Sequence, residues 1–184
     1  MSRQELRLAG SGGQGVILAT VILAEAAIIS GKHTAQSQSY GPEARGGSCK
    51  AETLISDEPI GFTKVQNPTF LMALTQKSLD DYGPKVDENC LVLIDSALEV
   101  PEDMPAAKVI KLPILETART EVGRLQTANI VAVGCINGFL NITDAASMEK
   151  AVMMHIPKGT EKLNMKALEL GKGLAEKWLE ENGK

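Results

Sequence analysis

A glycine-rich turn near the start of the chain constrains its fold more than any other feature. Residues 5–9 alternate polar and apolar side chains, which predicts a strand, and they lead directly into residues 10–15, Gly-Ser-Gly-Gly-Gln-Gly. A helix is predicted from about Gly15 to Ser30, and Gly31 is well placed to end it. Glycines let the backbone approach a ligand closely, and free amides at a helix N-terminus favour an anion. The G-x-G-x-x-G spacing between a strand and a helix therefore predicts a turn that can bind an anion.

The residues that follow this turn argue against a dinucleotide site. Such a site also needs an acidic residue about 20 residues further on, which holds the ribose hydroxyls. Residues 32–38 read Lys-His-Thr-Ala-Gln-Ser-Gln and contain no carboxylate. An NAD-dependent enzyme is therefore disfavoured. Two interpretations stay open: a turn that binds a phosphate-bearing cofactor, and a turn that serves only tight packing of strand against helix.

The rest of the chain alternates strand-like and helix-like segments. Strands are predicted at 49–55, 70–74, 90–95 and 108–113, and helices at 76–82, 128–139, 143–154 and 161–181. The continuous apolar runs at 70–74 and 90–95 are typical of strands buried on both faces of a parallel sheet. The pattern predicts an α/β fold, a three-layer Rossmann-like domain with a mostly parallel sheet, formed by residues 1–184 as a single domain.

The helix expected after the turn is unusual in its composition. Residues 16–29 are apolar on nearly every side, whereas a helix that covers only its own sheet keeps a polar outer face. An additional surface is expected to cover it, and an isolated chain could form a homodimer through a face meant for partners. A charged substitution at Ile22 or Ile29 is accordingly expected to weaken assembly more than folding.

Composition excludes several classes of protein. The chain has 184 residues and a net charge of −4, which offers no general attraction for nucleic acid or an anionic membrane. The longest apolar run, 16–29, is shorter than the roughly 20 residues that cross a bilayer. The N-terminus lacks the pattern of a secretory signal, so a cytoplasmic location is expected. Cys49, Cys90 and Cys135 are far apart and form no Cys-x-x-Cys pair, so no metal or cluster site is predicted.

A second motif occupies residues 39–47, Ser-Tyr-Gly-Pro-Glu-Ala-Arg-Gly-Gly. Its three glycines and its proline are too irregular for the interior of a helix or strand, which predicts a loop of defined shape. Arg45 carries a fixed fork of donors that suits a carboxylate or phosphate. In the alternative interpretation, Glu43 and Arg45 are solvated residues of a structural turn.

The two motifs together resemble the gamma subunit of the 2-oxoacid:ferredoxin oxidoreductases, which also occurs as a domain of single-chain pyruvate enzymes. Residues 10–15 resemble the family's Gly-x-Gly-Gly-Gln-Gly turn and residues 39–47 its Tyr-Gly-Pro-Glu-x-Arg-Gly-Gly loop. The sequence of the loop is most similar to that of the 2-oxoglutarate type, with the pyruvate and ketoisovalerate enzymes as relatives. The resemblance covers roughly residues 6–139. Thr69 is a departure, because relatives often have an aspartate there.

The resemblance implies a function shared among several chains. The family reaction is oxidative decarboxylation of a 2-oxoacid to its acyl-coenzyme A with reduction of ferredoxin. This chain has no Gly-Asp-Gly segment for thiamine diphosphate and magnesium and no cysteine cluster. Thiamine diphosphate, magnesium and the iron–sulfur clusters are therefore expected on alpha, beta and delta-type subunits, and no catalytic or metal-binding residue is expected here.

Coenzyme A is the ligand expected at the turn. It carries a pyrophosphate, which suits a glycine turn without the ribose-binding acid. The residues expected to line its site are Gly10, Ser11, Gly12, Gly13, Gln14 and Gly15, with Tyr40, Glu43 and Arg45 at its border or at the subunit contact. The alternative is a stand-alone Rossmann-like module that binds a phosphate-bearing ligand, or a scaffold without turnover.

Overall fold

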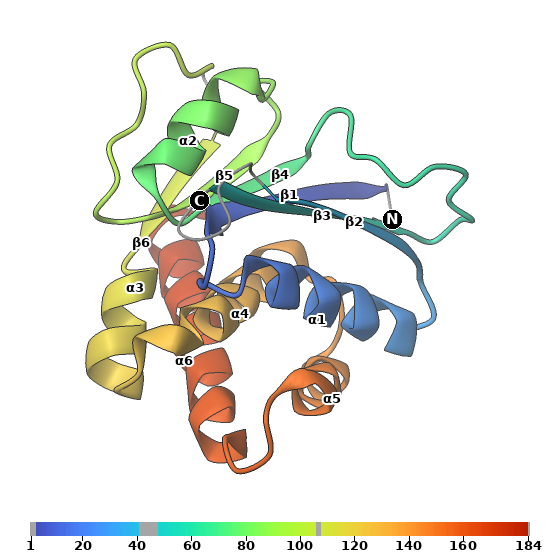
Figure 1. Cartoon of the computed structure of the whole chain (residues 1–184), viewed down its shortest axis with the longest axis vertical. Coiled ribbons are helices and arrows are strands. Elements are labelled where there is room, and N and C mark those ends of the chain that lie inside the picture. The colour runs from blue at the N-terminus through green and yellow to red at the C-terminus, as the bar shows by residue number, and fades with distance from the viewer. Residues whose placement is uncertain (1–2, 41–47, 106–107, 184) are drawn as a thin grey trace.

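A six-stranded sheet runs through the middle of the molecule (Figure 1). The computed structural model describes residues 3–40, 48–105 and 108–183. Within these residues the strands are β1 (Gln4–Ser11), β2 (His33–Tyr40), β3 (Ser48–Ser56), β4 (Phe70–Ala73), β5 (Leu91–Asp95) and β6 (Lys108–Leu112). Their order across the sheet is β2-β3-β1-β4-β5-β6.

The directions of the strands divide the sheet into two parts. Neighbouring strands among β1, β4, β5 and β6 are parallel, whereas β3 is antiparallel to both β1 and β2. One strand thus runs against the other five, and the prediction of a mostly parallel sheet is confirmed. The strand β2 is absent from the sequence-based expectation. The residues of β2 are mostly polar and include no run of large apolar side chains, because the strand lies at the edge of the sheet.

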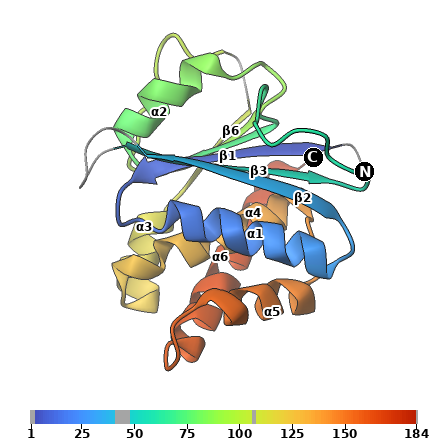
Figure 2. The ribbon, with the colours of Figure 1, turned by 45° about the vertical axis from the view of Figure 1, so that its right-hand side comes forward.

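Helices cover both faces of the sheet, as an α/β fold requires (Figures 1 and 2). The helix α2 (Gln76–Tyr82) lies on one face, followed by a short 3-10 turn, η1 (Gly83–Lys85). The other face carries α1 (Val16–Ile29), α3 (Ile114–Thr117), α4 (Ala128–Leu140), α5 (Ala145–His155) and α6 (Glu161–Asn182), with a π-helical turn, η2 (Ala118–Val122), and a 3-10 turn, η3 (Leu125–Thr127), before α4. No helix in the described part of the chain is both long and apolar enough to span a membrane.

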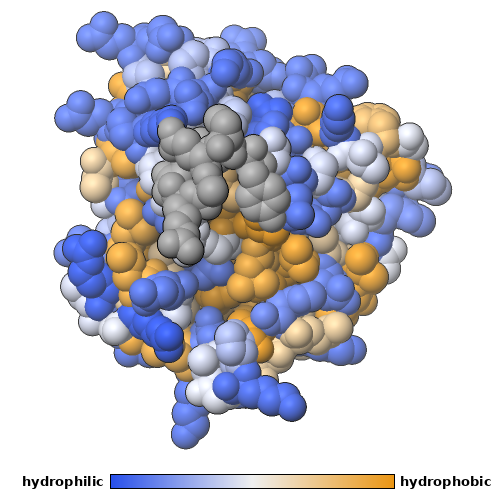
Figure 3. Space-filling model, in the orientation of Figure 1, coloured by the Kyte–Doolittle hydropathy of each residue, from blue (hydrophilic) through white to orange (hydrophobic). Residues whose placement is uncertain are grey.

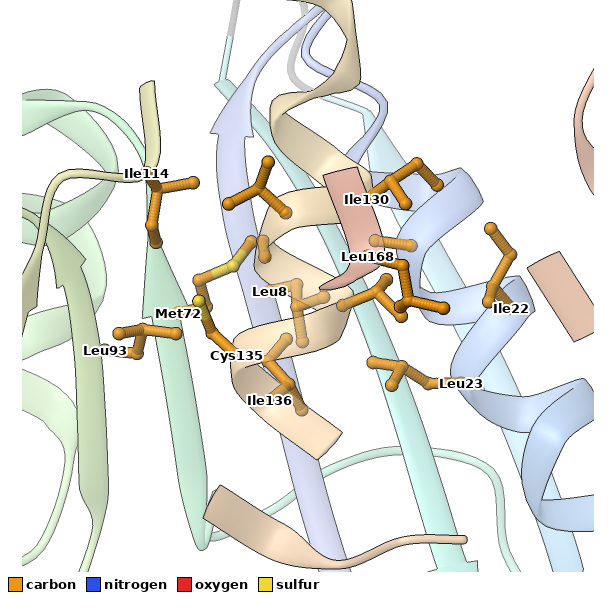
Figure 4. Close-up of a cluster of buried hydrophobic side chains, with 14 of the residues drawn as sticks. Leu8, Ile22, Leu23, Met72, Leu93, Ile114, Ile130, Cys135, Ile136 and Leu168 are labelled. Atoms are coloured by element: carbon orange, nitrogen blue, oxygen red, sulfur yellow. The ribbon is translucent and has the colours of Figure 1, made fainter. Parts of the chain in front are cut away.

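Two apolar cores lie on the two sides of the sheet. The larger one joins the sheet to α1, α4 and α6, and Figure 4 shows Leu8 of β1 and Met72 of β4 facing Cys135 of α4. The smaller one lies under α2 and includes Leu79 and Val92. Strands β4 and β5 contribute side chains to both cores, which explains their continuous apolar sequences.

The apolar character of α1 has an explanation within the chain. The helix α5 packs along α1 on the side away from the sheet, so two layers of helices cover the sheet there (Figure 1). Ile22 is fully buried in the larger core, so the expectation that a charge there weakens assembly more than folding is wrong. Part of α1 stays uncovered, since Ile28 is 52% exposed. Figure 3 shows apolar residues gathered at the centre of one face, around the junction of α1, α4 and α6 in Figure 1.

Candidate functional site

The glycine turn lies at the carboxyl edge of the parallel strands, where the topology changes direction. From β1 the chain continues into α1 on one face of the sheet, and from the neighbouring β4 it continues into α2 on the other face. Open α/β sheets bind ligands in the crevice at such a switch point. The carboxyl ends of β1 and β4 are therefore the candidate site of this fold.

At the start of α1, the backbone presents amides that have no hydrogen-bond partner among the described residues. Gly13 and Gly15 have φ angles of 94° and 70°, which side-chain-bearing residues rarely adopt. The first helical hydrogen bond runs from the Ala19 amide to the Gly15 carbonyl at 3.0 Å, so the amides of residues 16–18 precede the helical ladder. Within residues 3–40, 48–105 and 108–183, no side chain caps this helix end, and the first turn of α1 contains no acidic residue. The turn can therefore accept an anion from solution or from a cofactor.

Two side chains hold the turn in shape. The Oε1 atom of Gln14 accepts a hydrogen bond from the Ser11 amide at 2.8 Å. A Cβ atom on Gly10 would lie 2.5 Å from that oxygen, so only glycine leaves room for the Gln14 side chain. On the other side, Asn129 of α4 donates its Nδ2 to the Gly15 carbonyl at 3.4 Å. Gln14 thus positions the turn internally and Asn129 anchors it to the helical layer.

The structure brings the ends of the two sequence motifs together. In the sheet register, Cys49 of β3 pairs with Gly10 of β1 on one side and with Tyr40 of β2 on the other. Strand β2 therefore ends, and strand β3 begins, at the same edge as the glycine turn. Glu43 and Arg45 lie outside the described residues, so their predicted place at the border of the site stays a prediction.

The sheet order also explains why this turn differs from a dinucleotide site. In the doubly wound fold that binds NAD, the second strand lies beside the first and supplies the acid for the ribose. Here β3 lies between β1 and β2, and β2 carries no carboxylate along His33–Tyr40. A ribose held beside β1 would find no acidic partner on β2.

Two other described residues at this edge, Asp95 and Cys49, have structural roles. Asp95, at the end of β5, is 2% exposed, and its carboxylate accepts hydrogen bonds from the amides of Ala97 and Leu115 at 3.1 and 2.8 Å. Burial raises the pKa of the Cys49 thiol, which disfavours the reactive thiolate. Among the described residues, no group of three or more His, Cys, Asp and Glu side chains is placed to hold a metal ion. The edge is suited to binding through the backbone.

Sequence reasoning did not place Asn129 at the turn. It is 4% exposed and touches Gly15 from a point 114 residues later in the chain. Thr69 lies elsewhere: its hydroxyl accepts from the Glu5 amide at 2.9 Å and its own amide donates to the Glu5 carbonyl. Thr69 therefore joins the starts of β1 and β4, far from the glycine turn, and has a structural role.

Comparisons with known proteins agree on one family. The family model for pyruvate ferredoxin/flavodoxin oxidoreductase matches residues 5–174. A 2-oxoglutarate synthase subunit KorC of Methanocaldococcus jannaschii is 45% identical over 172 residues, which cover 92% of each chain. The gamma subunit of a keto/oxoacid ferredoxin oxidoreductase from Geobacter sulfurreducens has a solved structure that matches 96% of this chain and 98% of its own, with 40% identity and a TM-score of 0.85.

A third match is more distant in sequence. The 2-oxoglutarate:ferredoxin oxidoreductase of Magnetococcus marinus, solved with 2-oxoglutarate, coenzyme A and succinyl-CoA bound, superposes with a TM-score of 0.87 at 20% identity. The match covers 96% of this chain and 32% of that one, and it shows a shared fold. The near full-length matches confirm the resemblance drawn from the two motifs. The chain belongs to the pyruvate ferredoxin/flavodoxin oxidoreductase family.

Proposed function

We propose that this chain is the gamma subunit of a multi-subunit 2-oxoacid:ferredoxin oxidoreductase that acts on 2-oxoglutarate. The complex would decarboxylate the 2-oxoacid oxidatively, transfer the acyl group to coenzyme A and reduce ferredoxin. The observation that carries the proposal is the 45% identity to a 2-oxoglutarate synthase subunit along 92% of both chains. The stand-alone binding module is not favoured, because the relatives are subunits of larger enzymes.

The part of this chain in the reaction would be to hold coenzyme A. The glycine turn leads into the amides of residues 16–18, which have no partner among the described residues, at the positive end of the 14-residue helix α1; both features suit the pyrophosphate of that cofactor. A structural relative with the same fold was solved with coenzyme A bound. Gly10, Gly13 and Gly15 would give the cofactor access to the backbone, while Gln14 would fix the shape of the turn. Tyr40, Glu43 and Arg45 would border this site or a subunit contact.

The decarboxylation and the electron transfer would take place on other subunits. We assign thiamine diphosphate, magnesium and the iron–sulfur clusters to alpha, beta and delta-type subunits, with ferredoxin as the electron acceptor and the cytoplasm as the location. In this chain the three cysteines are buried separately, one in β3, one before β5 and one in α4, so they suit packing better than cluster binding. The partly exposed apolar residues of α1 would be covered on assembly.

Reconstitution tests the proposed function. The chain is combined with the thiamine-binding and ferredoxin-like subunits of the same organism, and 2-oxoglutarate-dependent ferredoxin reduction is measured as the coenzyme A concentration varies. The variant Gly12→Glu adds a carboxylate at an exposed turn residue that does not have a positive φ. It should raise the KM for coenzyme A about tenfold or more, since the added charge repels the phosphates. The control Gly61→Glu adds the same charge at an open position in another loop.

Each outcome bears on a separate part of the proposal. No assembly, or no ferredoxin reduction on mixing, would refute the assignment as a gamma subunit. Full activity with an unchanged KM for coenzyme A in Gly12→Glu would keep the subunit assignment and refute the role of the turn. A higher rate with pyruvate or a branched 2-oxoacid than with 2-oxoglutarate would refute the substrate.

A further inference from the structure

A second concave surface lies away from the glycine turn, between α5 and α6. The two helices and the second half of α4 enclose a cavity of about 760 Å³. Its origin is in the packing of α4 against α6, which is unusually close: a Cβ atom on Gly134 would lie 2.3 Å from the Leu168 carbonyl oxygen, and one on Gly171 2.0 Å from the Val131 carbonyl oxygen. Because α5 packs mainly against α1, it stands apart from α6 and leaves the cavity open.

The lining of this cavity, which we call the α5–α6 groove, combines apolar side chains with polar groups of α4 and the loop after it, and exposed charged residues stand at its mouth. The larger apolar side chains are Met148 on α5 and Met165, Leu168 and Leu179 on α6. Met148 is buried, whereas Leu179 is 39% exposed. The α6 residues that line the groove extend from Met165 to Leu179, which corresponds to about 21 Å along a helix. The groove is therefore a long slot with two helical walls.

Negative charge predominates at the mouth. Glu149 lines one wall and Glu169 and Glu176 line the other. Lys172, the one cation among the described residues of the lining, is 3.4 Å from Glu176. Asp144 also lines the groove, but its carboxylate accepts from the Ser147 amide at 2.9 Å and so compensates the N-terminus of α5. Three carboxylates against one ammonium group leave the mouth with two excess negative charges.

We propose that the α5–α6 groove receives an amphipathic helix from another subunit of the complex, with an apolar stripe flanked by Lys and Arg. The length of the slot matches about four helical turns, and apolar anchors at helical spacing would fill it from the mouth. Methionine side chains adapt to such anchors. The acidic mouth would pair with basic residues beside the stripe and set the orientation of the helix. This inference rests on the proposed function, since it requires a partner subunit.

The same charge argument disfavours α1 or α5 of a second copy of this chain as the occupant. The helix α1, which has exposed apolar residues, contains no Lys or Arg along Val16–Ile29, and α5 contains one, Lys150. Neither would complement the acidic mouth. A small apolar molecule would leave the charges at the mouth without partners.

Charge reversal on both walls of the groove tests the inference. The double variant Glu149→Lys/Glu169→Lys changes exposed side chains for which no ion pair occurs among the described residues, so its melting temperature should equal that of the wild type. Its affinity for the co-purified partner subunits should fall at least tenfold at low salt, and the loss should shrink as ionic strength rises. The matched control, Glu88→Lys/Glu102→Lys, makes the same change in net charge outside the groove and should bind as the wild type does.

Hydrogen exchange locates the contact. In the assembled complex, amides of α5 and of residues 165–179 should exchange more slowly than in the isolated chain, and a photoreactive residue in place of Leu179 should cross-link to a Lys- or Arg-rich helix of a partner. A complex that assembles and is active, yet shows unchanged exchange there and cross-links only to a second copy or to nothing, would overturn the inference and leave the proposed function intact. Failure of the wild-type chain to assemble would instead refute the proposed function.

Discussion

Replacing Gly15 by alanine should damage the turn through two separable effects. The left-handed conformation of Gly15, with φ of 70°, costs an alanine about 1 kcal/mol after allowance for the lower entropy of its unfolded state. The new Cβ would also lie 2.5 Å from Nδ2 and 2.9 Å from Cγ of Asn129, which is 4% exposed and has little room to move. Displacing that side chain loses its hydrogen bond and strains the packing, at about 2 kcal/mol more.

The expected total is a loss of about 3 kcal/mol, or about 6–12 °C in melting temperature for a chain of this size. Urea unfolding measures the first quantity and calorimetry the second. Gly13→Ala is the matched control, because Gly13 has a φ of 94° but nothing lies within 4 Å of its Cβ position. It should lose about 1 kcal/mol only. Equal losses in the two variants, or no recovery when Gly15→Ala is combined with Asn129→Ala, would refute the assignment of Asn129 as the anchor of the turn.

Three further predictions concern single interactions. Burial raises the pKa values of Cys90 and Cys135 to about 12, so a thiol reagent at pH 8 should label both only on unfolding, and rapid labelling of the native chain would contradict the buried assignment. Glu52→Gln should lower the free energy of unfolding in urea by about 3 kcal/mol, because it removes the charge that pairs with the largely buried Arg7, whose Nε lies 2.7 Å from the Glu52 carboxylate. The double variant Arg7→Met/Glu52→Leu, which replaces the ion pair by apolar side chains, should recover most of that stability. Asp144→Ala should lower the melting temperature at pH 7. Hydrogen bonds from the Ser147 amide and hydroxyl lower the pKa of Asp144, so this difference should be complete above about pH 4 and shrink as the pH falls through the folded-state pKa. A difference that did not shrink on acidification would contradict the cap.

The elements around the turn were predictable because local sequence rules and tertiary packing agree there. The strand–glycine–helix pattern locates β1 and α1 to within two residues at each end, with Gly15 as the left-handed cap before Val16. The apolar runs locate β4 and β5, and the predicted strand at 108–113 locates β6, each to within one residue at each end. The start of α5 moves from the expected 143 to Ala145, since Asp144 accepts from the Ser147 amide and so ends the loop.

Other features depend on contacts that no local pattern encodes. Strand β2 is held by pairing with β3, and its polar sequence gives no strand signal of its own. The helical turns between Ile114 and Val122 lack a clear period and were not expected. The cover of α1 by α5 and the contact of Asn129 with Gly15 each join segments more than 100 residues apart. The sequence indicated the turn as a candidate site, whereas Asn129 as its anchor and the α5–α6 groove could be found only in the folded structure.

The central claim is that this chain supplies a backbone cradle for coenzyme A in a shared active site. The most direct measurement is a structure of the assembled complex with coenzyme A bound. Phosphate oxygens of the cofactor should lie about 3 Å from amide nitrogens of the glycine turn or of the first turn of α1. Coenzyme A phosphates bound wholly by other subunits, with no contact to residues 10–18, would contradict the account.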